Sequence, residues 1–282
     1  MSTYLITGAT SGIGQACAQT LLAQGHELVI VCRNMDKAHA CFGPELTSGQ
    51  VKALTWDFDH NEGLFAFCAK ELKDYRFSGF IHGAGQCLFR PLIKSSYADA
   101  MHLLEVDFLS FTEISRALMR LRAPDQELSI VAISSISSLL HSKTMPLYGC
   151  IKSALNFYIT MMAKEVTERY GERLRLQISP TSVLEASIGE AIAPDDVANE
   201  EAQARKQRLM ACNQGLMVRI NAVAPNMVDT AMMAGIKQEI ADGAISEHLI
   251  PSEAVVDTIL QVMNNRFLTG QVICLNNGTF TL

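Results

Sequence analysis

A tyrosine and a lysine lie four residues apart in the stretch PLYGCIKSAL, as Tyr148 and Lys152. Four residues make about one helical turn, so both side chains would lie on the same face of a helix. An ammonium beside a phenol favours the phenolate, so such a pair is suited to proton transfer. The same spacing also occurs on ordinary helix faces. The pair therefore indicates catalysis only if other parts of the chain support it.

A glycine-rich turn, TGATSGIG, lies near the N-terminus between an apolar run and a stretch with helical spacing. Glycine lets a backbone turn sharply and approach a pyrophosphate, which the N-terminus of the following helix stabilises. A plain turn between a strand and a helix is the alternative, but three glycines in this context favour nucleotide binding. The residues of the turn that we expect to contact a cofactor are Gly8, Thr10, Ser11, Gly12, Ile13 and Gly14.

The end of the second apolar run, VCRN, indicates which nucleotide would bind. An acidic residue there would bind the ribose hydroxyls of NAD, whereas the guanidinium of Arg33 would bind the 2′-phosphate of NADP. A solvent-facing arginine is the alternative, and the glycine turn favours NADP(H), with Asn34 in the same site. After the third apolar run, Asp57 would accept a hydrogen bond from the adenine, beside Phe58, or would cap a turn.

Alternating strand and helix patterns must position these residues. Apolar runs typical of buried strands lie near residues 4–8, 26–33, 51–59, 77–85, 128–135, 218–225 and 270–278. Stretches with helical spacing lie near 15–25, 62–74, 97–121 and 148–170. This alternation predicts an α/β fold with one Rossmann-type, doubly wound parallel sheet and helices on both faces. No linker marks a second domain, so we expect a single domain over residues 1–282.

One region breaks the alternation before the sixth strand. The helical pattern ends near residue 171 and the next strand begins near Met217, which leaves residues 172–216 as an insertion. Acidic residues lie early and basic residues late in its second half, as a helix dipole favours. We therefore expect an added surface element with a helix at about residues 195–212.

Composition and charge exclude several classes of protein. The chain has 282 residues, 49% of them hydrophobic and 18% charged, which is typical of a globular protein. Its net charge of −6 argues against nucleic-acid binding. The eight cysteines include no C-x-x-C pair, so we expect reduced thiols and no metal site. No leader and no apolar run long enough to span a membrane is visible, so we expect a soluble, cytoplasmic protein.

In their order and spacing, these motifs resemble those of the short-chain dehydrogenase/reductase family over nearly the whole chain. HGAG at 82–85 stands for that family's N-N-A-G turn, and ISS at 133–135 for its serine motif. The Tyr-x-x-x-Lys motif follows, and then NAVAPNMVDTAM at 221–232 and FLTGQVICLNNG at 267–278. Any one of these motifs is weak evidence, whereas the ordered set is specific.

The resemblance implies a role for each matching residue. Ser135, rather than its neighbour Ser134, would hydrogen-bond the substrate carbonyl. Tyr148 would donate a proton to that oxygen as hydride arrives, and Lys152 would lower the phenol pKa and bind the nicotinamide ribose. Thr230 would contact the carboxamide. The other cofactor contacts implied are Gly83, Ala84, Gly85, Pro225 and Val228.

Two departures from the family pattern bear on activity. Asp107 stands where the family usually has an asparagine that holds a water in the proton relay. Its carboxylate would pair with Lys152 but oppose formation of the tyrosinate, which would reduce activity or shift its pH optimum. Asp107 as a simple interior polar residue is the alternative. The second departure is His82 and Gly83, whose turn must form its hydrogen bonds differently, and we expect His82 to be structural.

We therefore expect an NADPH-dependent oxidoreductase that reduces a ketone to a secondary alcohol, resembling 3-oxoacyl-[acyl-carrier-protein] reductases. The substrate would be a small carbonyl compound or an acyl thioester, including one on a carrier protein. Residues 231–250 would form a lid, whose methionines suit an apolar substrate or core packing alike. A catalytically weak NADP(H)-binding sensor or scaffold is the alternative. Since members of the family pair through their long helices, we expect a homodimer or homotetramer.

Overall fold

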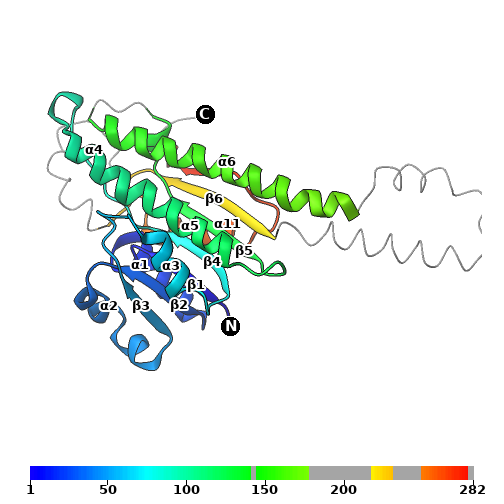
Figure 1. Ribbon diagram of the computed structural model, residues 1–282. Coiled ribbons are helices and arrows are strands. Elements are labelled where there is room, and N and C mark those ends of the chain that lie inside the picture. Colours follow the sequence, from blue (N-terminus) through cyan, green and yellow to red (C-terminus); the bar gives the residue numbers. More distant parts are fainter. Residues whose placement is uncertain (141–143, 178–216, 231–248, 279–282) are drawn as a thin grey trace, which may run out of the picture.

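In the part of the chain that the structure describes, the apolar runs form one seven-stranded sheet with parallel pairing throughout. Figure 1 shows this computed structural model, which describes residues 1–140, 144–177, 217–230 and 249–278. The strands are β1 (Thr3–Thr7), β2 (Glu27–Cys32), β3 (Val51–Thr55), β4 (Phe77–His82), β5 (Leu128–Ile133), β6 (Val218–Pro225) and β7 (Val272–Leu275). The predicted Rossmann-type parallel sheet is confirmed.

The strand order, β3-β2-β1-β4-β5-β6-β7, fixes where a ligand would bind. The chain runs outward from β1 to β3, then crosses to β4 on the other side of β1 and continues to β7. Between β1 and β4 the order reverses, and in such sheets ligands bind beyond the carboxyl ends of the strands at that point. The last residues of these strands, Thr7 and His82, are paired in register there.

Helices cover both faces of the sheet, as predicted (Figure 1). The core on one face includes α3 (Leu64–Glu71), α5 (Ser110–Leu121) and α6 (Pro146–Gln177). The core on the other face includes α1 (Gly12–Ala23), α2 (Met35–Ser48) and α11 (Ser252–Asn264). No helix in the described part of the chain is both long and apolar enough to cross a membrane.

The helix predicted over 97–121 is divided by a wider, π-helical turn. α4 (Tyr97–Leu103) leads into η2 (Leu104–Leu109) before α5 begins. In η2 the Glu105 carbonyl accepts a hydrogen bond from the Ser110 N–H, five residues on, and a second from Asn61 Nδ2 at 2.8 Å. Asp107 lies in this turn, and π turns inside helices often carry functional side chains.

The expected end of the next helix was wrong. α6 begins at Pro146, a favoured first residue of a helix, and continues to Gln177, past the predicted end near residue 171. The predicted insertion therefore overlaps the end of α6 over 172–177. The rest of it, with the helix expected at 195–212, lies outside the described residues, as does most of the expected lid.

Candidate active site

The glycine turn after β1 lies against the turn after β4. Gly8 has a φ of 68°, and a Cβ on it would lie 2.4 Å from the carbonyl carbon and oxygen of Gly83. A Cβ on Gly14 would lie 2.3 Å from the Gly8 carbonyl oxygen. Both contacts are too short for any side chain, so glycine is required at both positions. The two turns thus pack into a backbone cradle at the carboxyl edge of the sheet, the place where sheets of this order bind a dinucleotide.

The N-terminus of α1 offers donors to an anion. Its N-cap, Ser11, has extended backbone geometry and forms no side-chain capping hydrogen bond within the described chain, and the first helical turn contains no acidic residue. The first N–H groups of a helix lack partners within the helix and attract negative charge. Thr230 lies over this turn, since a Cβ on Gly12 would be 3.6 Å from the Thr230 methyl group.

The turn after β4 is held by Thr7. The Gly83 N–H donates to the Thr7 carbonyl oxygen at 3.1 Å, and the Ala84 N–H donates to Thr7 Oγ1 at 3.1 Å. The same Oγ1 lies 2.9 Å from His82 Nδ1. These contacts of Thr7 hold the HGAG turn in place, where the family usually has asparagines. They also support a structural role for His82, which is fully buried.

Burial, with a smaller contribution from the positive charge of Lys152, lowers the pKa of His82 from 6.5 to about 3. Below pH 6.5 the unfolded chain therefore binds a proton at His82 that the folded chain does not bind. The resulting stability is fully present above pH 6.5 and is lost as the pH falls toward 3.

Between pH 8 and pH 5 this histidine should cost about 2 kcal/mol of folding stability, and the variant His82→Asn should lose that part of the pH dependence. Urea unfolding at the two pH values measures the difference. The exposed His39 provides the matched control, His39→Asn. An unchanged pH dependence in His82→Asn would show that His82 accepts a proton in the folded protein.

The tyrosine and the serine of the predicted site lie together. Tyr148 lies in the first turn of α6, is 8% exposed, and packs with Leu103 and Met145. Ser135 is the N-cap of the short helix η3 (Ile136–Ser138), two residues after the end of β5, and its side chain lies close enough to Tyr148 to lower the pKa of that phenol. The end of β5 and the start of α6 thus place two hydroxyl groups side by side.

The lysine of the motif forms a buried ion pair with Asp107. Lys152 Nζ lies 2.9 Å from Asp107 Oδ1, and the two side chains are 4% and 0% exposed. Nζ also donates to the Ile133 carbonyl at 2.9 Å, and Asp107 Oδ2 accepts from the Gln86 N–H at 3.0 Å. Asp107 is therefore not merely an interior polar residue. It joins α6 to the loop after β4.

The electrostatics of the pair bear on the expected role of Lys152. Burial raises the pKa of Tyr148 well above 10, and the neighbouring Cys87 and Asp107 raise it further, against a smaller opposing effect of Ser135. We expected Lys152 to lower this pKa. Its ammonium lies 5.8 Å from the Tyr148 ring centroid, but Asp107 neutralises it at close range. Burial also raises the pKa of Asp107, and Lys152 opposes that shift. A shifted pH optimum stays a prediction.

The residues expected around the adenosine lie at the ends of β2 and β3. Arg33 is exposed directly after β2, and Asn34 caps α2 by accepting from the Lys37 N–H at 2.9 Å. Asp57 accepts a hydrogen bond from the Asp59 N–H at 3.2 Å. It therefore caps a turn, as the alternative interpretation of this residue expected. The Phe58 side chain is buried in the core, so only its backbone is left to face a nucleotide.

The segment after β6 completes the edge of the site. Pro225 ends β6, and Val228 forms a bridge with Ile250. The Asp229 N–H donates to the Ile250 carbonyl at 2.9 Å, and the Ile250 N–H donates to the Met227 carbonyl at 2.8 Å. These bonds fix the chain on either side of residues 231–248.

Sequence reasoning missed several contacts. Thr7 was not predicted to brace the turn after β4, although its place directly before Gly8 could have indicated it. The backbone groups of Gln86 and Ile133 that bind the buried ion pair carry no sequence signal. The contact of Asp59 with His102 was also missed, because 43 residues separate them, from 59 to 102.

Two sites thus meet at the carboxyl edge of the sheet, a backbone cradle for a dinucleotide and a buried tyrosine beside a serine and a lysine. That combination defines an oxidoreductase that works with a nicotinamide dinucleotide. A sequence profile of the short chain dehydrogenase family matches residues 2–178, and the chain belongs to this family.

Individual relatives are distant but similar over their whole length. A 3-oxoacyl-[acyl-carrier-protein] reductase of Homo sapiens is 24% identical, over 97% of this chain and 95% of the relative. The uncharacterized oxidoreductase YmfI of Bacillus subtilis is 22% identical over 98% of each chain. A solved 3-oxoacyl (acyl-carrier-protein) reductase from Agrobacterium tumefaciens with NADP bound has 18% identity and a TM-score of 0.72, over 98% of this chain and 93% of that one. At 18% identity this solved structure supports only the fold of the chain.

Proposed function

We propose that this protein is an NADPH-dependent ketoreductase that converts a ketone, in first place a 3-oxoacyl thioester, into a secondary alcohol. The proposal rests on one observation, the placing of the buried Tyr148 phenol beside Ser135 and Lys152 at the carboxyl edge of the sheet. Burial raises the pKa of this phenol well above 10. A phenol that stays protonated at neutral pH is ready to donate a proton. Carbonyl reduction needs that donation, whereas alcohol oxidation needs the tyrosinate.

The neighbouring hydroxyl groups of Ser135 and Tyr148 would bind the same carbonyl oxygen. When bound, the reduced nicotinamide supplies a hydride to the carbonyl carbon. Negative charge then develops on the oxygen, which takes the Tyr148 proton and keeps a hydrogen bond from Ser135. Lys152 would stabilise the tyrosinate that remains. Its pairing with Asp107 weakens that help, and a proton from solvent must restore the phenol before the next turnover.

The cofactor preference rests on Arg33. It lies directly after β2 and is exposed, as a group that binds a 2′-phosphate must be. The glycines of the turn after β1, Gly8, Gly12 and Gly14, carry no side chain that could obstruct a phosphate. The solved relative with NADP bound supports the same choice. Because cells keep NADP mostly reduced, NADPH also suits the reducing direction.

The substrate class is inferred from the relatives. Several of the similar proteins are 3-oxoacyl-[acyl-carrier-protein] reductases, and the human protein and the Agrobacterium structure match 97% and 98% of this chain. A 3-oxoacyl thioester offers a ketone at a fixed distance from a carrier group. We propose that the cytoplasmic protein takes it either from a carrier protein or as a smaller thioester.

A panel of carbonyl compounds tests this function. Purified protein is mixed with NADPH and, in turn, an acetoacetyl thioester, a cyclic ketone and a sugar aldehyde, and the loss of nicotinamide absorbance is followed. We expect turnover of the thioester, and slower turnover with NADH. Binding of NADPH without turnover of any compound would contradict the proposal and favour a sensor or scaffold, the alternative function.

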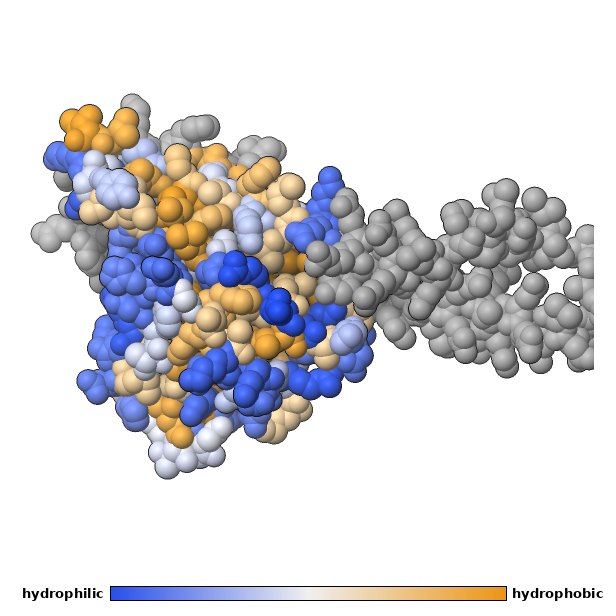
Figure 2. Space-filling model, in the orientation of Figure 1, coloured by the Kyte–Doolittle hydropathy of each residue, from blue (hydrophilic) through white to orange (hydrophobic). Residues whose placement is uncertain are grey.

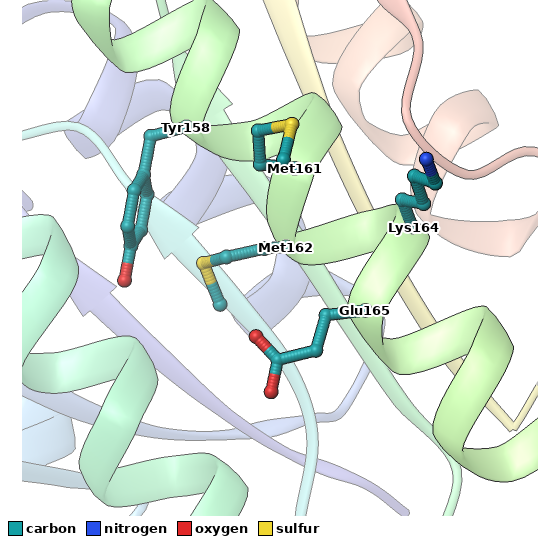
Figure 3. Close-up of a pocket in the computed structure, with 5 residues that line it drawn as sticks. All are labelled: Tyr158, Met161, Met162, Lys164 and Glu165. Carbon is teal, nitrogen blue, oxygen red and sulfur yellow. The ribbon is translucent and has the colours of Figure 1, made fainter.

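We further propose that the protein forms a homodimer or homotetramer through α6. Apolar side chains gather over this helix (Figure 2), among them Phe157 and Met161, which are 68% and 49% exposed. Beside them a pocket is lined by Tyr158, Met161, Met162, Lys164 and Glu165 (Figure 3). Exposed apolar surface of this kind is typical of a protein interface. The mass in solution can be measured by light scattering.

A further inference from the structure

Three charged or titratable side chains from separate elements meet beside the expected adenosine site. Arg33 follows β2, Asp59 lies in the loop after β3, and His102 lies in α4. Asp59 Oδ1 is 2.7 Å from His102 Nδ1, and Asp59 Oδ2 is 3.7 Å from the nearer Arg33 nitrogen. The three side chains are 61%, 31% and 35% exposed for Arg33, Asp59 and His102. The cluster is therefore open to a ligand.

The two contacts of Asp59 are unequal. Asp59 Oδ1 and His102 Nδ1 are in close polar contact at 2.7 Å, whereas the 3.7 Å between Asp59 Oδ2 and the nearer Arg33 nitrogen exceeds hydrogen-bonding distance. The first oxygen, Oδ1, is also shielded from solvent. His102 therefore holds the carboxylate, and the guanidinium keeps its N–H donors available for another acceptor.

This arrangement matters because a carboxylate and a phosphate compete for the same guanidinium. Both accept two parallel hydrogen bonds from arginine, so a free Asp59 would be able to turn onto Arg33 and occupy its donors. Its negative charge would also repel a 2′-phosphate. With its Oδ1 bound by His102, Asp59 is held at a distance where it orients Arg33 without capturing it.

We propose that His102 and Asp59 together set the preference of this site for NADPH over NADH, with His102 holding Asp59 off Arg33. The inference rests on the proposed use of NADPH. It adds two specificity-determining residues, one of them on α4, to the arginine after β2. The other aspartate of the loop after β3, Asp57, is exposed and accepts a hydrogen bond from the Asp59 N–H, which fixes the backbone of Asp59.

The effect of each substitution on selectivity has a defined sign. His102→Ala frees the carboxylate, so the ratio of NADPH to NADH affinity should fall about tenfold, as expected for losing one close polar contact of a charged group. Asp59→Asn removes the competing charge, so the ratio should rise severalfold. In the double variant no carboxylate remains to be released, so the ratio should equal that of Asp59→Asn alone.

Equilibrium binding tests the proposal without any turnover. The dissociation constants of NADPH, NADH and adenosine 2′,5′-bisphosphate are measured for the full-length protein by fluorescence titration, at one pH and salt concentration. His60→Ala is the matched control, since His60 is an exposed histidine next to Asp59 and should leave the ratio unchanged. Thermal unfolding confirms that each variant is folded.

The outcomes separate this inference from the proposed function. A ratio in His102→Ala that stays within twofold of the wild-type ratio would overturn the inference alone. The inference alone would also be overturned if His102→Ala lowered the NADPH affinity of the Asp59→Asn variant as much as it lowers that of the wild-type protein. If the wild-type protein binds NADPH and NADH equally, both the proposed NADPH use and the inference are overturned.

Discussion

Replacing Tyr148 with phenylalanine is expected to lower kcat for ketone reduction by about 10²–10⁴-fold, the usual contribution of a positioned proton donor. The change removes only the hydroxyl, which lies beside Ser135. The ring is 8% exposed and packs in a small apolar cluster, and phenylalanine fills the same space. The dissociation constant of NADPH should therefore stay nearly unchanged. Steady-state kinetics and fluorescence titration measure the two quantities.

The matched control is Tyr158→Phe, which removes a hydroxyl from the same helix at the pocket in Figure 3. It should keep its activity. If Tyr148→Phe retained most of the wild-type kcat, the hydroxyl would not be the proton donor. A loss of NADPH binding in Tyr148→Phe would show instead that the residue acts on the cofactor.

The second large effect is expected at the buried ion pair. Lys152→Met should lower the free energy of unfolding by about 3–5 kcal/mol, because it leaves the fully buried carboxylate of Asp107 without its charged partner. Adding Asp107→Asn removes the stranded charge and should restore most of that loss. Urea unfolding of the two single variants and the double variant at pH 8 measures the coupling.

The pH dependence of this loss has a defined sign. Burial raises the pKa of Asp107 in the folded protein above its ordinary value of 3.8. Removing Lys152 takes away the charge that opposes this shift, so the pKa of Asp107 rises further in the variant. The penalty of Lys152→Met is therefore full above the variant's pKa and should shrink as the pH falls below it, since the carboxyl then takes a proton. Lys164→Met, an exposed lysine on the same helix, should have little effect. A double variant no more stable than Lys152→Met would contradict this account.

Much of the fold was predictable because its strands are buried on both faces. β2 and β6 are almost entirely buried, so they appear in the sequence as continuous apolar runs that signal a parallel sheet. α2 and α11 were not predicted. In α2 the sequence places Gly43 and Pro44 in the middle of the helix, and the backbone of Phe42 departs from helical geometry there.

The candidate site was predictable to the extent that its residues lie close together in sequence. The glycine turn and the Tyr148–Lys152 motif are local patterns, and the structure places them as local geometry requires. The π turn at Asp107 carries no such pattern, because it results from the packing of η2 against α6 and Asn61. The direction of the Tyr148 pKa shift depends on burial, which neighbouring residues in the sequence do not reveal.

The bridge between Val228 and Ile250 has a consequence for how the protein can diverge. The chain before residue 231 and the chain after residue 248 meet at one place, where backbone hydrogen bonds that do not depend on side chains join them. Substitutions at Val228 and Ile250 by residues other than proline can therefore accumulate without parting β6 from α11, so this edge of the site tolerates new side chains better than the glycine turn does.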